Sequence, residues 1–196
     1  MARIEDGKGR GFFTGVDSTG RLEVSSATVS EEIFATYEGE SYAFGTGTVS
    51  YTAATNSAIL YVRNDDVRPL TLDRIRVMLG TATGGTGDWN ISFRRNPTGG
   101  TLISTANAGT PLNINHGSSI NPDATFYTSG GTTGLTLTGG TGGIFPIKST
   151  GDGQVLFEFG RVLTTGSSFG VILTPPPGTT AADVFCVLRA YYPQNQ

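Results

Sequence analysis

The sequence predicts an all-β fold, an antiparallel β-sandwich of the jelly-roll type preceded by an extended N-terminal arm. The first observation is composition, since the 196-residue chain contains 29 glycines, 9 prolines and 11 phenylalanines. The second is pattern, because about nine to twelve short runs of β-branched and aromatic residues recur roughly every 8–12 residues between glycine-rich turns. The third is that no long window has the apolar spacing of an amphipathic helix. Such a series of strands indicates a two-sheet sandwich or a barrel, and we favour the jelly roll.

Residues 1–21 are predicted to form the arm. This segment is polar and glycine-rich, and its few apolar side chains cannot offset the entropy of ordering it in isolation. We therefore expect it to become ordered by lying on a neighbouring molecule, with a frayed terminus as the alternative. The residues predicted to bind that partner are Arg3, Ile4, Arg10, Phe12, Phe13 and Val16.

Residues 22–196 are predicted to form a single sandwich domain. In its first half, alternating or compact apolar runs predict strands at Leu22–Ser30, Ser41–Thr52, Ser57–Asn64 and Leu70–Gly80. The alternation of the last run breaks at Asp73, which indicates a β-bulge. The segment Val29–Gly39 is the only candidate for a helical turn, and its pattern fits a strand equally well.

The second half repeats the pattern. Trp89, Ile91 and Phe93 alternate with polar residues, as in a half-buried strand. Further strands are predicted at 101–104, 124–128, 133–139, 143–148, Gln154–Gly160, Ser168–Thr174 and Asp183–Tyr192. The loop-rich stretch Gly99–Thr133 is predicted to be an elaborated connection, because it carries apolar anchors of its own.

The charge balance limits the classes of partner. A formal net charge of −3 gives no basic surplus for binding nucleic acid. Only Lys8 and Lys148 among the 13 basic residues are lysines, and arginine is the basic residue favoured at protein interfaces. No apolar stretch is long enough to suggest a signal peptide or a membrane span. The single cysteine, Cys186, is predicted to be a small buried hydrophobic residue.

Few residues could carry chemistry. His116 is the only histidine, and its sequence context predicts a loop or surface position. Glycoside hydrolysis would need two paired carboxylates, but no spacing ties the acidic residues together. The acids considered are Glu31, Glu32, Asp65, Asp66, Asp123, Asp152 and Glu158. We predict turn positions for most of them, and no catalytic residue, metal site or cofactor.

Three segments carry a resemblance to a known group of proteins. MARIEDGKGRG at Met1–Gly11, VDSTGRL at Val16–Leu22 and AILYVRN at Ala58–Asn64 resemble small structural proteins from the virion modules of tailed bacteriophages. The resemblance covers roughly the first 80 residues. The second half is similar only in being the glycine- and threonine-rich β-structure common in capsid decoration, fibre and baseplate proteins. The resemblance implies a virion component without catalytic residues.

These expectations lead to one main functional hypothesis and two alternatives. The main hypothesis is a capsid decoration or cement protein, a homotrimer in the virion whose arm binds major capsid protein or a sister subunit. The first alternative is a tail fibre, spike or baseplate module that binds host glycan through an aromatic platform near Trp89 or Phe126–Tyr127. The second is a polysaccharide-degrading enzyme, which would need clustered acids or His116 in a cleft. No nucleic acid or membrane partner is expected.

Overall fold

The computed structural model describes residues 14–16, 22–24, 30–105, 107–147 and 153–193, which fall into two compact units, Met1–Ser30 and Glu31–Gln196. In the first unit, β1 (Thr14–Val16) and β2 (Leu22–Val24) pair antiparallel, with Val16 opposite Leu22. The start of the predicted strand at 22–30 thus pairs with β1 and not with the large sheets. Residues 1–13 lie outside the described part of the chain.

The second unit is an antiparallel β-sandwich. Eight strands build its body, in the chain order β3 (Ser41–Tyr51), β4 (Ser57–Asn64), β5 (Leu70–Leu79), β6 (Trp89–Arg95), β10 (Thr141–Ile147), β11 (Gly153–Leu163), β12 (Ser168–Thr174) and β13 (Ala182–Tyr191). Three shorter strands, β7 (Asn107–Ala108), β8 (Leu112–Asn113) and β9 (Ala124–Thr128), extend the sheet edges. Two short helices complete the unit, α1 (Glu31–Tyr37) and α2 (Thr101–Thr105).

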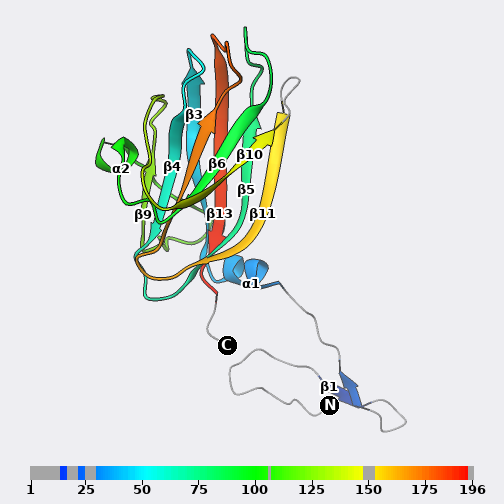
Figure 1. Ribbon diagram of the computed structural model, residues 1–196. Helices are drawn as coiled ribbons and strands as arrows, with labels where there is room; N and C mark the ends of the chain where they lie inside the picture. Colours follow the sequence, from blue (N-terminus) through cyan, green and yellow to red (C-terminus); the bar gives the residue numbers. More distant parts are fainter. Residues whose placement is uncertain (1–13, 17–21, 25–29, 106, 148–152, 194–196) are drawn as a thin grey trace. The chain divides into compact units, whose positions relative to one another are not determined.

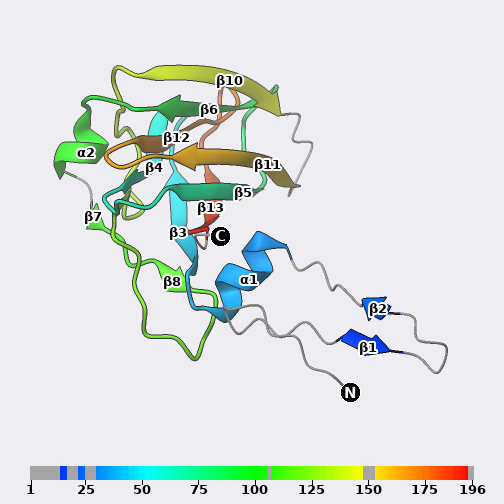
Figure 2. The same ribbon diagram turned by 90° about the horizontal axis from the view of Figure 1, so that it is seen from below.

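The strand order is that of a jelly roll. One sheet runs β11-β5-β13-β3 with β8 at its edge, and the other runs β10-β6-β12-β4 followed by β9 and β7. Successive body strands therefore alternate between the two sheets, except that β6 and β10 lie in the same sheet, as in the two Greek keys of a jelly roll. Figure 2 separates the two layers in a view from below. The predicted fold class is confirmed.

Side-chain alternation places the core between the sheets. Trp89, Ile91 and Phe93 of β6 point inward, as their spacing predicted. On β13 every second residue is buried, and Cys186 among them is fully covered, which confirms its predicted role as a core residue. Burial also raises the pKa of the Cys186 thiol.

The predicted bulge in β5 is present. Arg74 pairs with Arg189 of β13 while Leu72 pairs with the next residue, Ala190, so that Asp73 is the extra residue. The insertion restores the phase of the strand, and both the residues before it and those after it bury their apolar side chains. A strand of even alternation would have turned one of the two halves outward.

The predicted strand at 101–104 is wrong, because this segment forms α2. Four apolar or β-branched residues fit either structure, and packing decides between them. Leu102 is fully buried in a small second core on the outer face of the six-stranded sheet. The other buried members of this second core are Ala58, Tyr61, Leu137 and Ile172.

Candidate partner-binding surfaces

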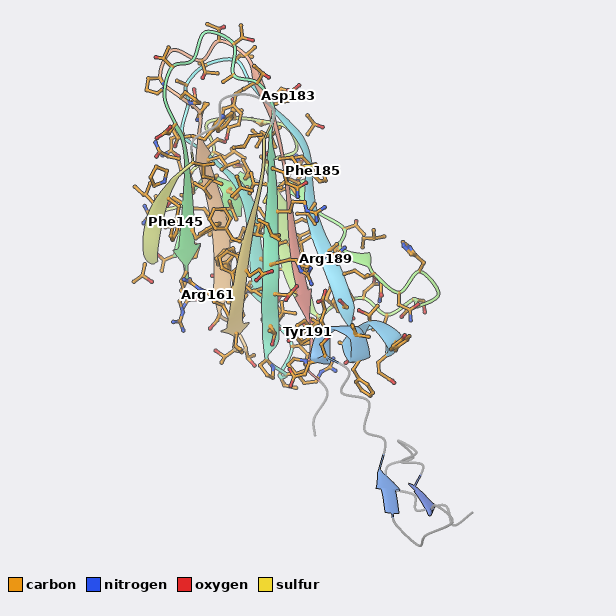
Figure 3. The ribbon with its side chains drawn as sticks, turned by 90° about the vertical axis from the view of Figure 1, so that its right-hand side faces the viewer. Phe145, Arg161, Asp183, Phe185, Arg189 and Tyr191 are labelled. Atoms are coloured by element: carbon orange, nitrogen blue, oxygen red, sulfur yellow. The ribbon has the colours of Figure 1, made fainter. Side chains whose placement is uncertain are left out.

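The outer face of the five-stranded sheet carries exposed apolar side chains. Phe185 and Val187 of β13 point outward beside Met78 of β5 and Leu156 of β11. Met78 is 38% exposed and Leu156 is 43% exposed. These four side chains, on adjacent strands, are called the bare face below. Figure 3 shows the outward residues of β13 in a line, from Asp183 and Phe185 to Arg189 and Tyr191 near α1.

Charged groups border the bare face at both ends. Asp183 lies at the end far from α1, where its carboxylate accepts a hydrogen bond of 2.6 Å from the Ser50 hydroxyl. Toward α1 lie Arg74 and Arg189, whose guanidinium groups approach the Glu32 carboxylate at 2.5 and 3.7 Å. The bare face thus has an acid at one end and two arginines, both paired with Glu32, at the other. Between these ends lie the apolar side chains and the exposed Arg76 of β5, which stands opposite Val187 and Leu156 in the sheet.

A shallow cavity of about 450 Å³ opens at the acidic end of the bare face. Met78 and Phe185 line it together with Asp183, Gly80 and Gly153. Gly45 leaves space beneath the neighbouring side chains, because a Cβ there would lie 3.8 Å from the Phe185 ring and 3.9 Å from Val187. The surface is therefore apolar, slightly hollow and accessible.

The outer face of the other sheet is partly covered by the chain itself. α2 packs there against β4 and β9, as Figure 1 shows at the left of the molecule. Leu102 and Leu137 of this cover complete the second core described above. Leu137 packs closely over Gly170 of β12, where a Cβ would meet its Cδ1 atom at 2.3 Å. The two sheets thus differ in how much of the outer face their own connections protect.

A second apolar surface lies on the flank of the sandwich, between the edge strands β10 and β11. A cavity of about 540 Å³ opens there, lined by Phe93, Phe145 and Phe169 and by Arg95 and Arg161 at its rim. Phe145 is 42% exposed. Figure 3 shows Phe145 and Arg161 on this flank, away from the line of β13 residues. We call this opening the flank cavity.

The flank cavity has an aromatic wall. The Phe93 ring centroid lies 5.0 Å from those of Phe157 and Phe159, both in edge-to-face geometry. The Arg161 guanidinium lies over the Phe159 ring at 5.6 Å. Because β10 and β11 are the last strands of their sheets, each presents an outer main-chain edge beside this wall.

Three of the acids considered from the sequence come together at the α1 end of the sandwich. The main-chain N–H groups of Asp65 and Asp66 both donate to the Asp123 carbonyl oxygen, at 3.0 and 2.9 Å. The carboxylates themselves are bound to cations, Asp65 to Arg63 at 2.7 Å and Asp66 to Arg68 at 3.0 Å. They are ion-pair partners in a turn, where the sequence predicted solvated acids.

The pKa values of these two carboxyls move away from what a general acid needs. Burial raises the pKa of Asp65, but hydrogen bonds from Thr125 and Arg63 outweigh it and leave the pKa lowered. The side-chain hydrogen bond from Arg68 lowers the pKa of Asp66. A carboxyl that donates a proton in glycoside hydrolysis needs a raised pKa.

The other candidates do not join this group. His116 lies exposed in a turn, as predicted. Glu32 pairs with the arginines of the five-stranded sheet, and Asp152 lies outside the described residues. No group of three metal-ligating side chains occurs in the described part of the chain. None of the helices described there is long and apolar enough to cross a membrane.

Of the aromatic residues predicted as a glycan platform, Trp89 and Phe126 are buried and Tyr127 is partly exposed. Trp89 is fully buried and Phe126 is only 3% exposed, because both pack between the sheets. Tyr127 is partly exposed and stacks on Tyr61 at 5.9 Å. The burial of Trp89 agrees with the inward position that its spacing predicted.

The residues predicted to bind a partner fall almost entirely outside the described part. Arg3, Ile4, Arg10, Phe12 and Phe13 lie in residues 1–13, and only Val16 belongs to an element, β1. Their role stays a prediction. The bare face and the flank cavity were missed, although the exposed apolar residues of Asp183–Tyr192 and Gln154–Gly160 stood at outward positions of predicted strands.

No family model and no curated protein matches this chain. Among solved structures, one of Desmodium yellow mottle tymovirus matches at 11% identity and a TM-score of 0.22, over 80% of this chain and 88% of that one. One of turnip yellow mosaic virus matches at 8% identity and a TM-score of 0.20, over 94% and 93%. One of infectious bursal disease virus, Gx strain, matches at 11% identity and a TM-score of 0.23, over 92% of this chain and 45% of that one. At such TM-scores the matches establish neither fold nor function.

Proposed function

We propose that this protein is a non-enzymatic structural component of a bacteriophage virion, and specifically a capsid decoration or cement protein. It would bind major capsid protein and further copies of itself, with its N-terminal segment as the anchor. The resemblance of Met1–Gly11, Val16–Leu22 and Ala58–Asn64 to virion proteins of tailed phages motivates the proposal. The jelly-roll sandwich supports it, because a rigid β-body with paired strands suits a protein that has to hold its shape in a lattice.

The observation that carries the proposal is where the exposed apolar side chains gather. Met78 and Leu156 on the bare face and Phe145 and Val162 at the flank cavity are exposed beside further, partly buried apolar side chains, whereas isolated exposed hydrophobic residues elsewhere are ordinary on any protein. Both places are bordered by arginine, which is enriched at protein interfaces. Surfaces of this kind are typical of a protein that is covered by neighbours when it functions.

The anchoring role belongs to the arm. Ile4, Phe12, Phe13 and Val16 would bury their side chains on a neighbouring subunit, while Arg3 and Arg10 would bind its carboxylates or main-chain carbonyls. Many modest contacts along an extended segment add up to a stable attachment, and the entropy of ordering the segment is lost only on binding.

The test measures how much of the protein binds to capsids that lack it. Capsids that lack this protein are mixed with the full chain, with a chain deleted for residues 2–20, and with the double variant Phe12→Ala/Phe13→Ala. A matched double variant, Thr14→Ala/Thr19→Ala, controls for changing the same segment. We expect occupancy to fall strongly for the deletion and the phenylalanine variant only. Unchanged occupancy after the deletion would remove the arm as anchor.

Position in the particle decides between head and tail. We expect a cryo-EM map of the intact virion to place the chain on the capsid lattice, in groups of three if the predicted homotrimer is right. Density on a fibre, spike or baseplate would overturn the decoration role. A glycan array is expected to show no binding, because neither Trp89 nor Phe126 is available as a platform.

A further inference from the structure

We propose that the bare face pairs with the bare face of a second copy of this chain across a two-fold axis. The axis would lie in the interface, between the five-stranded sheet of one copy and that of the other, perpendicular to β13 and at the level of Cys186. The strands of the two copies would then run antiparallel, with β13 lying over β13. This inference does not depend on a virion role, because it concerns only the purified chain.

The order of side chains along β13 favours this arrangement. Its outward residues are Asp183, Phe185, Val187 and Arg189, so that an acid and a base enclose two apolar side chains. Reversing the strand about the midpoint between Phe185 and Val187 places Phe185 of one copy opposite Val187 of the other. The same reversal places each Asp183 opposite the other copy's Arg189, which gives two symmetric ion pairs.

Charge also selects against the alternative orientation. If the two strands ran parallel, each Arg189 would face the Arg189 of the second copy, and the Arg74 side chains of both copies would lie at the same end of the interface. Like charges placed directly opposite each other oppose association. In the antiparallel arrangement this basic row faces Asp183 and the uncharged Gly80, its neighbour in the cavity wall.

The cavity at the acidic end can accept the second copy's arginine. The Arg189 side chain is 46% exposed and its guanidinium lies 3.7 Å from Glu32, which leaves room for a further carboxylate. Its methylene stem could pack on Met78 and Phe185 of the other copy while its guanidinium meets Asp183 at the rim. α1 lies at the opposite end of the face, so it leaves the strip between Asp183 and Arg189 accessible (Figure 3).

The test uses two charge-reversal variants, each of which should weaken dimer formation alone, whereas a mixture of the two should restore it. In a homodimer of the Asp183→Arg variant, residues 183 and 189 that face each other are both positive. In a homodimer of the Arg189→Asp variant, the same two residues are both negative. When the two variants are mixed, every Asp–Arg pair is restored in the heterodimer, with its polarity reversed at one end. Glu38→Arg, at an exposed position on another part of the surface, makes the same change of charge as a control.

We expect the full chain to associate in analytical ultracentrifugation, and each single reversal to raise its dissociation constant by roughly tenfold or more. The equimolar mixture should regain the mass of the unmodified assembly, and the Glu38→Arg variant should match the unmodified chain. If a reversal does not fold by circular dichroism, Met78→Glu replaces it and should also weaken association. An unmodified chain that stays monomeric, a face covered by another protein, or reversals without effect would each overturn the proposal.

Discussion

At the residue scale, Asn64 connects several segments of the sandwich through its side chain. Its side chain is fully buried, and its amide nitrogen donates to the carbonyl oxygens of Arg68 and Leu163 at 2.8 and 2.9 Å. Its amide oxygen accepts a hydrogen bond of 3.1 Å from the Tyr192 hydroxyl. One side chain thus ties together the end of β4, the turn after it, the end of β11 and the chain beyond β13.

Asn64→Ala is expected to lower the free energy of unfolding by about 2–4 kcal/mol, because it leaves the buried Leu163 carbonyl and the partly buried Arg68 carbonyl without their donor. Urea denaturation followed by tryptophan fluorescence measures the change. Asn121→Ala, at an exposed position, should change stability by less than about 0.5 kcal/mol. Equal effects of the two substitutions would contradict the role assigned to Asn64.

The turn beside Asn64 should make stability depend on pH. Asp65 and Asp66 have lowered pKa values in the folded chain. A carboxyl with a lowered folded pKa stabilises the fold above its unfolded pKa, about 3.9, and loses that contribution as the pH falls toward the folded value.

We therefore expect the melting temperature to fall as the pH is lowered from about 5 to 2, as measured by circular dichroism. The variant Asp66→Asn should be less stable at neutral pH and should show a shallower fall over the same range. A variant whose melting temperature follows that of the unmodified chain at every pH would show that the Asp66–Arg68 pair contributes nothing.

At the element scale, the bulge in β5 determines whether the strand can serve the core. The sequence alone indicated it, because the alternation of apolar residues is broken at a single position. Asp73 lies at that position, and the strands on both sides of β5 keep their pairing around it. The bulge is thus part of the register of the five-stranded sheet.

Deleting Asp73 is expected to cost about 3 kcal/mol or more, because the apolar residues on one side of the deletion would turn to solvent. Asp73→Ala keeps the length of the strand, loses one ion pair with Arg74 and should cost about 1 kcal/mol or less. Denaturation midpoints of the two variants separate the effect of strand length from the effect of the Asp73 side chain. A deletion no worse than the substitution would show that the register can adapt.

At the scale of the whole molecule, the core that the structure describes is built from residues of the sandwich unit. In the described part of the chain, the buried apolar residues run from Ala35 to Tyr192. We expect a chain of residues 31–196 to fold alone, with a melting temperature within roughly 2 °C of the full chain. Calorimetry of both chains tests this, and a loss of cooperative unfolding in the shorter one would contradict it.

Much of the fold could be predicted from the sequence because the strands here are amphipathic. Period-2 alternation identified β6 and β5, and the break in the alternation of β5 identified the bulge at Asp73. Segments without a periodic pattern were predicted less well. The short run at 101–104 fits a helix or a strand, and it forms α2 because this conformation buries Leu102. The candidate surfaces were not predicted, because the sequence of a strand does not indicate what packs against its outward side chains.

The sequence by itself determined the class of the fold, the inward faces of the main strands and the poverty of catalytic groups. These properties depend on composition and on local spacing, which are complete in the chain before it folds. Only the tertiary structure decided that one sheet is covered by α2 while the other presents Phe185 and Val187, and that five phenylalanines meet on one flank. Such surfaces arise from strands distant in sequence, and their positions are fixed only when the two sheets pack together.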